Sequence, residues 1–117
     1  MKKMILASLM LFIGVQCSFA YNNGIGAFAG FPGSGYASSD TEYANINSYT
    51  EIWFSCYFTN GTGGYAYLKN GSSLVDSFQY QSESVYSHSA TYTGSWNTME
   101  LGIDCSNGSI GLAELRW

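Results

Sequence analysis

The sequence predicts an all-β protein, a small antiparallel β-sandwich. Apolar and polar residues alternate along stretches of about five to nine residues, which recur about every ten residues along the chain. Beyond residue 20, the sequence contains no amphipathic helical pattern. The chain is also rich in aromatic residues, with 10 Tyr, 7 Phe and 3 Trp, and these favour strands over helices. Short strands at regular spacing are typical of a sandwich or a small barrel.

Residues 1–20 are predicted to be a signal peptide that is cleaved after Ala20. Two lysines precede an apolar run, Met4–Val15, and the small residues Ser18 and Ala20 occupy the positions that signal peptidase reads. The apolar run is too short for a transmembrane helix, which needs about 20 residues. A lipid anchor on Cys17 is disfavoured because a glutamine precedes it. We therefore expect a secreted or periplasmic protein with no membrane insertion.

The mature chain, Tyr21–Trp117, is short and acidic. Lys69 and Arg116 are its only lysine and arginine, against eight acidic residues, so its formal charge is −6. This charge excludes nucleic acid and anionic lipid as partners. The length fits one domain, which we divide into a Gly-, Ala- and Ser-rich segment or edge strand at 21–40 and a β-sandwich domain at 41–117.

The segment 21–40 is expected to be a flexible terminus or an edge strand. An alternative is a donor strand that completes the sheet of another subunit, because Phe28-Ala29-Gly30 resembles the Phe-x-Gly pattern of chaperone–usher pilin extensions. Asp40 and Glu42 could help to bind calcium, but the spacing of a calcium loop does not continue after them. A solvated turn is expected there.

Two stretches carry the strongest strand patterns, Thr50–Phe58 and Met99–Cys105. One face of each is apolar, and Cys56 and Cys105 lie on these faces. Once Cys17 leaves with the signal peptide, an even number of cysteines remains, which in a secreted chain predicts a disulfide. Closing this loop should stabilise the fold by about 4 kcal/mol. The alternatives are free thiols or a metal site, and two cysteines alone make a poor metal site.

Shorter strands are expected at 43–47 and 85–92, and two Asn-Gly pairs predict tight turns. The first pair, Asn70-Gly71, should join a strand at 65–69 to one at 72–80. These two runs with Asn-Gly between them are the clearest hairpin signal in the chain.

The second pair, Asn107-Gly108, should turn the strand of Cys105 back into a partner strand at 109–117. In that register Glu114 would lie on the core face, unless a β-bulge near Leu112-Ala113 shifts the chain. We predict this bulge. Without it, Glu114 would be a buried carboxylate and of functional interest.

The segment 56–109 resembles an immunoglobulin-like sandwich. Cys56 lies on a strand similar to strand B, 65–71 resembles strand C and its turn, and 101–108 resembles strand F entering the F–G hairpin. The resemblance implies that the disulfide links the two sheets. The sequence departs from the pattern where Ile103 replaces the tyrosine expected two residues before the second cysteine. This architecture implies no specific function.

No catalytic residue, metal ligand or cofactor is predicted. His88 is the only histidine, so any catalytic triad or metal–histidine site would have to include it. Its neighbours Ser87 and Ser89 point to the opposite face of the strand, and we interpret His88 as a half-exposed strand residue. The sequence does not indicate which two of the eight carboxylates would form the catalytic pair of a glycosidase. We predict that the protein is not an enzyme.

The aromatic residues indicate a binding surface instead. Tyr65 and Tyr67 share one strand face, and Trp53 and Tyr57 lie on the face of their strand away from Cys56. Exposed Tyr and Trp rings on a flat sheet suit a glycan or a protein partner, although such rings could instead cover the sandwich itself. We predict a non-catalytic binding module for a glycan or a protein. The alternatives are a pilin-like structural subunit and a small inhibitor or immunity-type protein.

Overall fold

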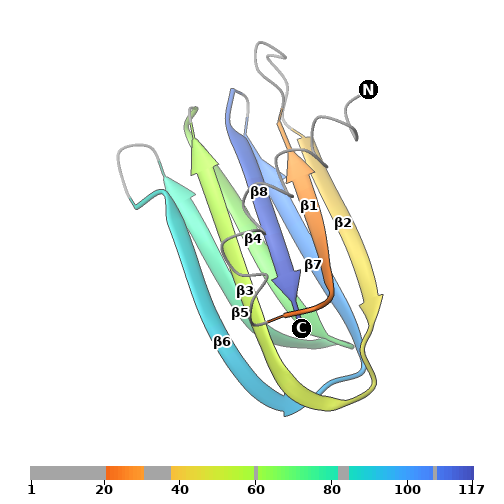
Figure 1. Cartoon of the computed structure of the whole chain (residues 1–117). Coiled ribbons are helices and arrows are strands. Elements are labelled where there is room, and N and C mark those ends of the chain that lie inside the picture. The colour runs from red at the N-terminus through yellow and green to blue at the C-terminus, as the bar shows by residue number, and fades with distance from the viewer. Residues whose placement is uncertain (1–20, 31–37, 60, 82–84, 107) are drawn as a thin grey trace.

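The computed structural model describes residues 21–30, 38–59, 61–81, 85–106 and 108–117. The segment predicted to be a signal peptide lies outside these ranges. Within them the chain forms eight strands and no helix, so this part contains no helix able to cross a membrane (Figure 1). The strands are β1 (Gly24–Ala29), β2 (Ser38–Asn45), β3 (Tyr49–Thr59), β4 (Gly63–Asn70), β5 (Ser73–Gln81), β6 (Ser87–Ser95), β7 (Thr98–Cys105) and β8 (Ile110–Arg116).

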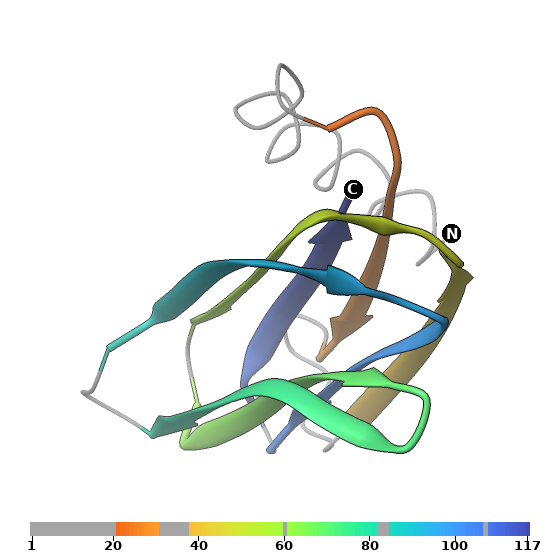
Figure 2. The same ribbon diagram turned by 90° about the horizontal axis from the view of Figure 1, so that it is seen from below.

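The strands form two four-stranded antiparallel sheets that pack face to face (Figure 2). Sheet A has the order β1-β8-β3-β6, and sheet B has the order β2-β7-β4-β5. Almost every connection therefore crosses from one sheet to the other, and only β4 and β5 are consecutive strands that pair. This arrangement is that of an eight-stranded jelly roll. The predicted all-β antiparallel sandwich is confirmed.

The core lies between the sheets and follows from the alternation of side chains along each strand. On β3, Ile52, Phe54 and Phe58 are fully buried, and on β7 Leu101 and Ile103 face them from sheet B. Burying each such side chain stabilises the fold by about 1.5–3 kcal/mol. The two strand patterns that predicted these inner faces are confirmed.

The β4–β5 hairpin forms where Asn70-Gly71 predicted a tight turn. Asn70 pairs with Ser73, so the turn consists of Gly71 and Ser72, one residue later than expected. Gly71 has a φ of 62°, a left-handed conformation that glycine adopts without steric cost.

The second predicted hairpin is wrong, because β7 and β8 belong to different sheets. Asn107 lies outside the described residues, but a turn is present, since the Ser109 N–H donates to the Ser106 carbonyl at 3.0 Å. After this turn β8 enters sheet A and pairs with β1 and β3. The immunoglobulin-like resemblance is therefore only coarse. Its C–F pairing corresponds to the β4–β7 pair, but its F–G hairpin does not occur.

The predicted bulge near Leu112-Ala113 is also wrong, because β8 pairs with both neighbours in unbroken register. Glu114 is indeed buried, at 1% exposure, but it lies opposite Ser55 on the outer face of sheet A. Burial raises the pKa of its carboxyl, and the Arg116 guanidinium at 2.9 Å partly opposes this rise. The neighbouring strand leaves space for this pair with Gly24 and Gly26, and a Cβ on Gly24 would overlap Arg116.

Side chains from β2 close one side of the sandwich against β1. The carboxylate of Asp40 accepts a hydrogen bond from the Phe28 N–H at 3.2 Å, and the Gly30 N–H donates to the Ser38 hydroxyl. These donors belong to the edge of β1 that faces away from β8. Asp40 thus lies within a strand and satisfies the edge of the opposite sheet, where the sequence had indicated a solvated turn.

The predicted disulfide is absent, because Cys56 and Cys105 are both free and buried. They lie in opposite sheets, but they pack against different neighbours. Cys56 lies beside His88 and Ala113 in sheet A. Cys105 packs over the β1–β8 pair, where its thiol lies 3.5 Å from the Ala29 carbonyl. Burial raises the pKa of each thiol to about 12, so both are protonated and poorly reactive.

We expect reducing agent to leave the stability of the fold unchanged. The free energy of unfolding, measured in urea with and without dithiothreitol, should agree, because no crosslink constrains the unfolded chain. Thiol titration should label Cys56 and Cys105 slowly in the folded protein and fully in urea. A melting temperature that falls on reduction would contradict the structure.

Candidate functional site

The structure separates the four aromatic residues that were predicted to form one binding surface. Trp53 and Tyr57 lie on the outer face of sheet A, because the alternate residues of β3, such as Phe54, point into the core. Tyr65 and Tyr67 lie on the outer face of sheet B, since the alternate residues of β4 are buried. The prediction that each pair shares a face is confirmed, but the two pairs occupy opposite sides of the molecule.

The tyrosines of sheet B form a ring pair with one fixed member. The centroids of Tyr65 and Tyr67 are 5.9 Å apart. The Tyr67 hydroxyl donates to a Glu100 carboxylate oxygen at 2.6 Å. Its ring lies over Gly102, where a Cβ atom would overlap it, and Lys69 Nζ lies 5.2 Å from the ring centroid. The bond to Glu100 raises the pKa of Tyr67, which remains a neutral donor at physiological pH.

An open groove with a volume of about 680 Å³ begins beside Tyr65. Across the sheet Tyr65 pairs with Asp104 on β7 and with Gln79 on β5, so these three side chains form one row on the outer face. The next row of the sheet carries Gln81 opposite Gly63. Gly63 has no side chain to fill the middle of that row. The groove is lined by Thr62, Gly63, Gly64, Tyr65, Gln79, Tyr80, Gln81, Asp104, Cys105 and Ser106.

Hydroxyl groups at the end of the groove hold its wall in place. The Ser106 hydroxyl donates to the Gly63 carbonyl at 2.7 Å and lies 3.0 Å from the hydroxyl of Thr62. Ser109, which is buried, lies 3.1 Å from Ser106 and accepts from the Gly63 N–H at 3.2 Å. These contacts tie the start of β4 to the end of β7.

Sequence reasoning missed the polar residues of this groove. The alternation along Met99–Cys105 places Asp104 on the face opposite Cys105, but it did not indicate a binding role for Asp104. No local signal shows that β4 lies between β5 and β7, and only this order brings Gln79 and Asp104 to opposite sides of Tyr65. The site depends on strand neighbours that are distant in the sequence.

The outer face of sheet A is more apolar. Tyr57 is 49% exposed and lies opposite Leu112 on β8. Leu112 in turn lies opposite Phe28 on β1. Trp53 lies opposite Arg116. This face thus presents aromatic rings beside apolar and charged neighbours.

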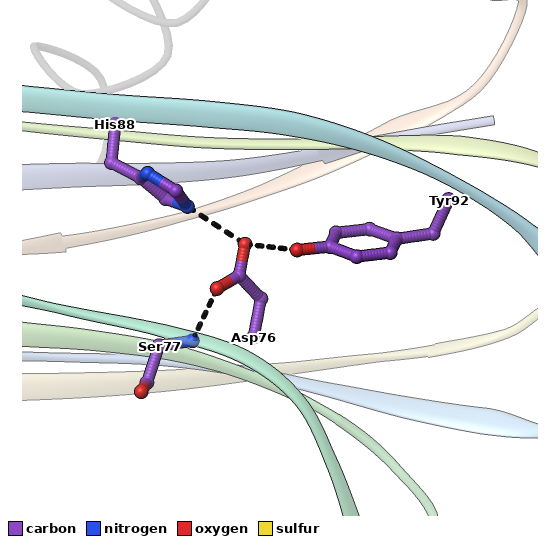
Figure 3. A network of polar contacts seen from close by, with 4 residues as sticks. All are labelled: Asp76, Ser77, His88 and Tyr92. Carbon is purple, nitrogen blue, oxygen red and sulfur yellow. Dashed lines mark hydrogen bonds and ion pairs between the residues drawn. The ribbon is translucent and has the colours of Figure 1, made fainter.

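A second polar cluster lies between β5 and β6, on the side of the sandwich away from β1 (Figure 3). One carboxylate oxygen of Asp76 accepts a hydrogen bond from the Tyr92 hydroxyl at 2.6 Å. The same oxygen lies 2.8 Å from His88 Nε2. The other accepts from the Ser77 N–H at 2.7 Å. The ring of His88 stacks on Phe78, with centroids 5.5 Å apart.

The hydrogen bonds decide how Asp76 titrates. Burial opposes ionisation of its carboxyl, but the bonds from Tyr92 and His88 outweigh this effect and lower the pKa of Asp76. Burial, followed by the bond to this carboxylate, raises the pKa of Tyr92 to about 12. The carboxylate of Asp76 is therefore an ionised acceptor, and the Tyr92 hydroxyl and the His88 ring are its donors. The cluster joins the two sheets at a place where their backbones are not paired.

The cluster contains an Asp-His pair but lacks an activated nucleophile. Cys56 lies opposite His88 in the β3–β6 pair, and the raised pKa of the Cys56 thiol keeps this thiol protonated. Among the described residues, no group of three or more His, Cys, Asp and Glu side chains is arranged to hold a metal ion. We interpret the cluster as a structural link. His88 is half-exposed, with 32% of its side chain accessible, as expected from the sequence, and it reaches Asp76 on the opposite sheet.

No family model matches the sequence, and no curated protein matches it either. Among solved structures, the chain is similar to the pre-peptidase C-terminal domain of a collagenase from Bacillus anthracis, at 18% identity and a TM-score of 0.52, covering 82% of this chain and 88% of that domain. A carbohydrate-binding module of family 6 from a laminarinase of Zobellia galactanivorans overlays with a TM-score of 0.44 at 13% identity, covering 86% and 95%. The first likeness supports the β-sandwich fold and nothing beyond it.

We expect Asp76→Asn to destabilise the fold in a pH-dependent way. The folded-state pKa of Asp76 is lowered. The stability that ionised Asp76 contributes is therefore fully present above its unfolded-state pKa of about 4, and it is lost as pH falls through the folded-state pKa. Urea unfolding at pH 7 should show a loss of about 1–3 kcal/mol, and this difference should shrink under acidic conditions.

The matched control is Asp104→Asn, which changes an exposed carboxylate and should alter stability by less than about 0.5 kcal/mol. An Asp76→Asn protein as stable as wild type at pH 7 would show that the cluster does not link the sheets.

Proposed function

We propose that the protein is a secreted or periplasmic, non-catalytic module that binds a glycan in the groove on the outer face of sheet B. The observation that carries this proposal is the row of Asp104, Tyr65 and Gln79 across three neighbouring strands. An aromatic ring between a carboxylate and an amide combines an apolar face with hydrogen-bond partners. A pyranose ring has the same combination of surfaces.

The physical match rests on the two kinds of surface that a sugar presents. Its axial C–H groups form an apolar face, which can pack on the ring of Tyr65, a residue that is 36% exposed. Its equatorial hydroxyls can donate to Asp104 and exchange hydrogen bonds with the amides of Gln79 and Gln81. The groove is open at the surface, which suits a chain of sugars rather than a small enclosed ligand.

Preorganisation of the neighbouring ring reduces the entropic cost of binding. Tyr67 is already held by Glu100 and by its contact with Gly102. A sugar that extends along β4 from Tyr65 would therefore meet a second ring that does not need to be ordered. The contacts of Ser106 fix the far wall in the same way.

The charge of this face restricts the class of sugar. Glu100 and Asp104 are carboxylates on the outer face of β7, and Lys69 is the one lysine of the mature chain. Negatively charged sugars would be repelled at this surface. We expect neutral oligosaccharides to bind more tightly than uronic acid oligomers of the same length.

We expect Tyr65→Ala to weaken binding of a neutral oligosaccharide by about tenfold or more, which corresponds to about 1.4 kcal/mol or more, because it removes the ring on which the sugar packs. The ligand would first be identified on a glycan array, and affinities would then be measured by titration calorimetry.

Tyr57→Ala is the matched control, since it removes an exposed tyrosine from the outer face of sheet A and should leave affinity unchanged. The proposal is wrong if the array shows no binding, or if Tyr57→Ala and Tyr65→Ala weaken binding equally.

A further inference from the structure

Strand β6 forms an edge of sheet A, and its outward side chains are all small and polar. It pairs with β3 in register over nine residues, and its other side has no partner strand within the described chain. All its outward side chains are exposed. These residues are Ser87, Ser89, Thr91, Thr93 and Ser95.

The hydrogen bonds to β3 show which backbone groups of β6 point to the open edge. The Phe58 N–H donates to the Tyr86 carbonyl at 2.8 Å, and the Trp96 N–H donates to the Ser48 carbonyl at 3.0 Å. Both bonds fit the register of β3 with β6, in which Cys56 lies opposite His88. Bonded pairs alternate along an antiparallel ladder. The even-numbered residues of β6 therefore bond to β3, and the odd-numbered residues direct their N–H and C=O groups outward.

Two of the other edges of the sandwich, β1 and β5, carry features that block strand addition. The outward N–H groups of Phe28 on β1 and of Gly30, directly after β1, are bonded to side chains of β2. The edge strand β5 has an irregular register opposite Leu68 and Lys69, and it carries the charged Asp76. Strand β6 carries no charged residue other than a titratable histidine, no proline and no irregularity in its pairing.

The sequence of β6 is complementary to itself in the antiparallel direction about Thr91. A two-fold axis at Thr91 would place Thr91 opposite its own copy and Ser89 opposite Thr93. On the inner face, His88 would lie opposite Gly94, and Tyr92 would lie opposite Ala90. Each large side chain of the inner face thus meets a small one, and the outward pairs are hydroxyl residues, a combination that stabilises cross-strand pairing.

We propose that the partner of the β6 edge is a second copy of this chain, paired antiparallel about Thr91. The odd-numbered residues from Ser89 to Thr93 would form the bonded pairs, at two hydrogen bonds each. Ser95 lies outside this central set, because its carbonyl already accepts from the Asn70 side chain at 3.2 Å.

The dimer would join the two copies of sheet A into one continuous sheet. The two-fold axis is perpendicular to this sheet, so both copies of sheet B lie on the same side of it. Their grooves would then face the same way, and a polymeric ligand could contact both. The pairing itself does not involve the groove residues.

Cysteine crosslinking in the full chain tests the register. Thr91→Cys should form a disulfide-linked dimer on mild oxidation, because the paired Cα atoms would be about 5.5 Å apart. Thr93→Cys is the matched control, with the same outward orientation. Its two copies would be about 13 Å apart, so it should remain uncrosslinked, whereas the double variant Ser89→Cys/Thr93→Cys should crosslink.

Sedimentation of the full chain over a concentration series tests association without crosslinking. Wild type and Asn45→Lys, which adds a charge on the exposed surface of β2, should both dimerise. Thr91→Lys should be a folded monomer, because the two-fold axis places its charges opposite each other. A monomeric wild type, dimerisation of Thr91→Lys equal to wild type, or equal crosslinking of Thr91→Cys and Thr93→Cys would overturn the proposal.

Discussion

The insertion of β8 between β1 and β3 is the pairing on which the rest of the structure depends. It completes sheet A and carries the chain across from sheet B, and its small inner residues Gly111 and Ala113 let the two sheets approach closely. A Cβ on Gly111 would lie within 2.7–2.8 Å of Phe58 and of the Cys105 thiol, so no larger residue fits there without displacement. The central location of β8 also forces the first strand to the edge of sheet A, where side chains of β2 satisfy its outward donors.

The same topology distributes the aromatic residues between two outer faces with different chemistry. Sheet A presents Trp53 and Tyr57 beside apolar neighbours and a buried ion pair. Sheet B presents Tyr65 and Tyr67 among amides, hydroxyls and carboxylates, and a groove forms where Gly63 leaves the sheet uncovered. A glycan needs both an apolar ring face and polar partners. The proposal therefore rests on sheet B, since this architecture by itself serves many functions.

Local reasoning succeeded where a single strand or hairpin decides the outcome. The inner faces of β3 and β7 followed from their two-residue period, and the β4–β5 hairpin followed from Asn70-Gly71. It failed where the partner strand matters. The disulfide was inferred from an even cysteine count, yet Cys105 packs over Ala29 and not against Cys56. His88 is half-exposed as expected, but its partners Asp76 and Phe78 come from the opposite sheet, and no local pattern indicated them.

The sequence by itself determined which residues of β3 and β7 point inward, because side chains alternate with a period of two whatever the strand pairs with. It also determined the excess of acidic over basic residues beyond residue 20. Only the tertiary structure decided which strands are neighbours, because backbone hydrogen bonding between strands is the same for any pair of sequences. That choice placed Glu114 on an outer face, separated the two cysteines, and brought Gln79 and Asp104 to either side of Tyr65.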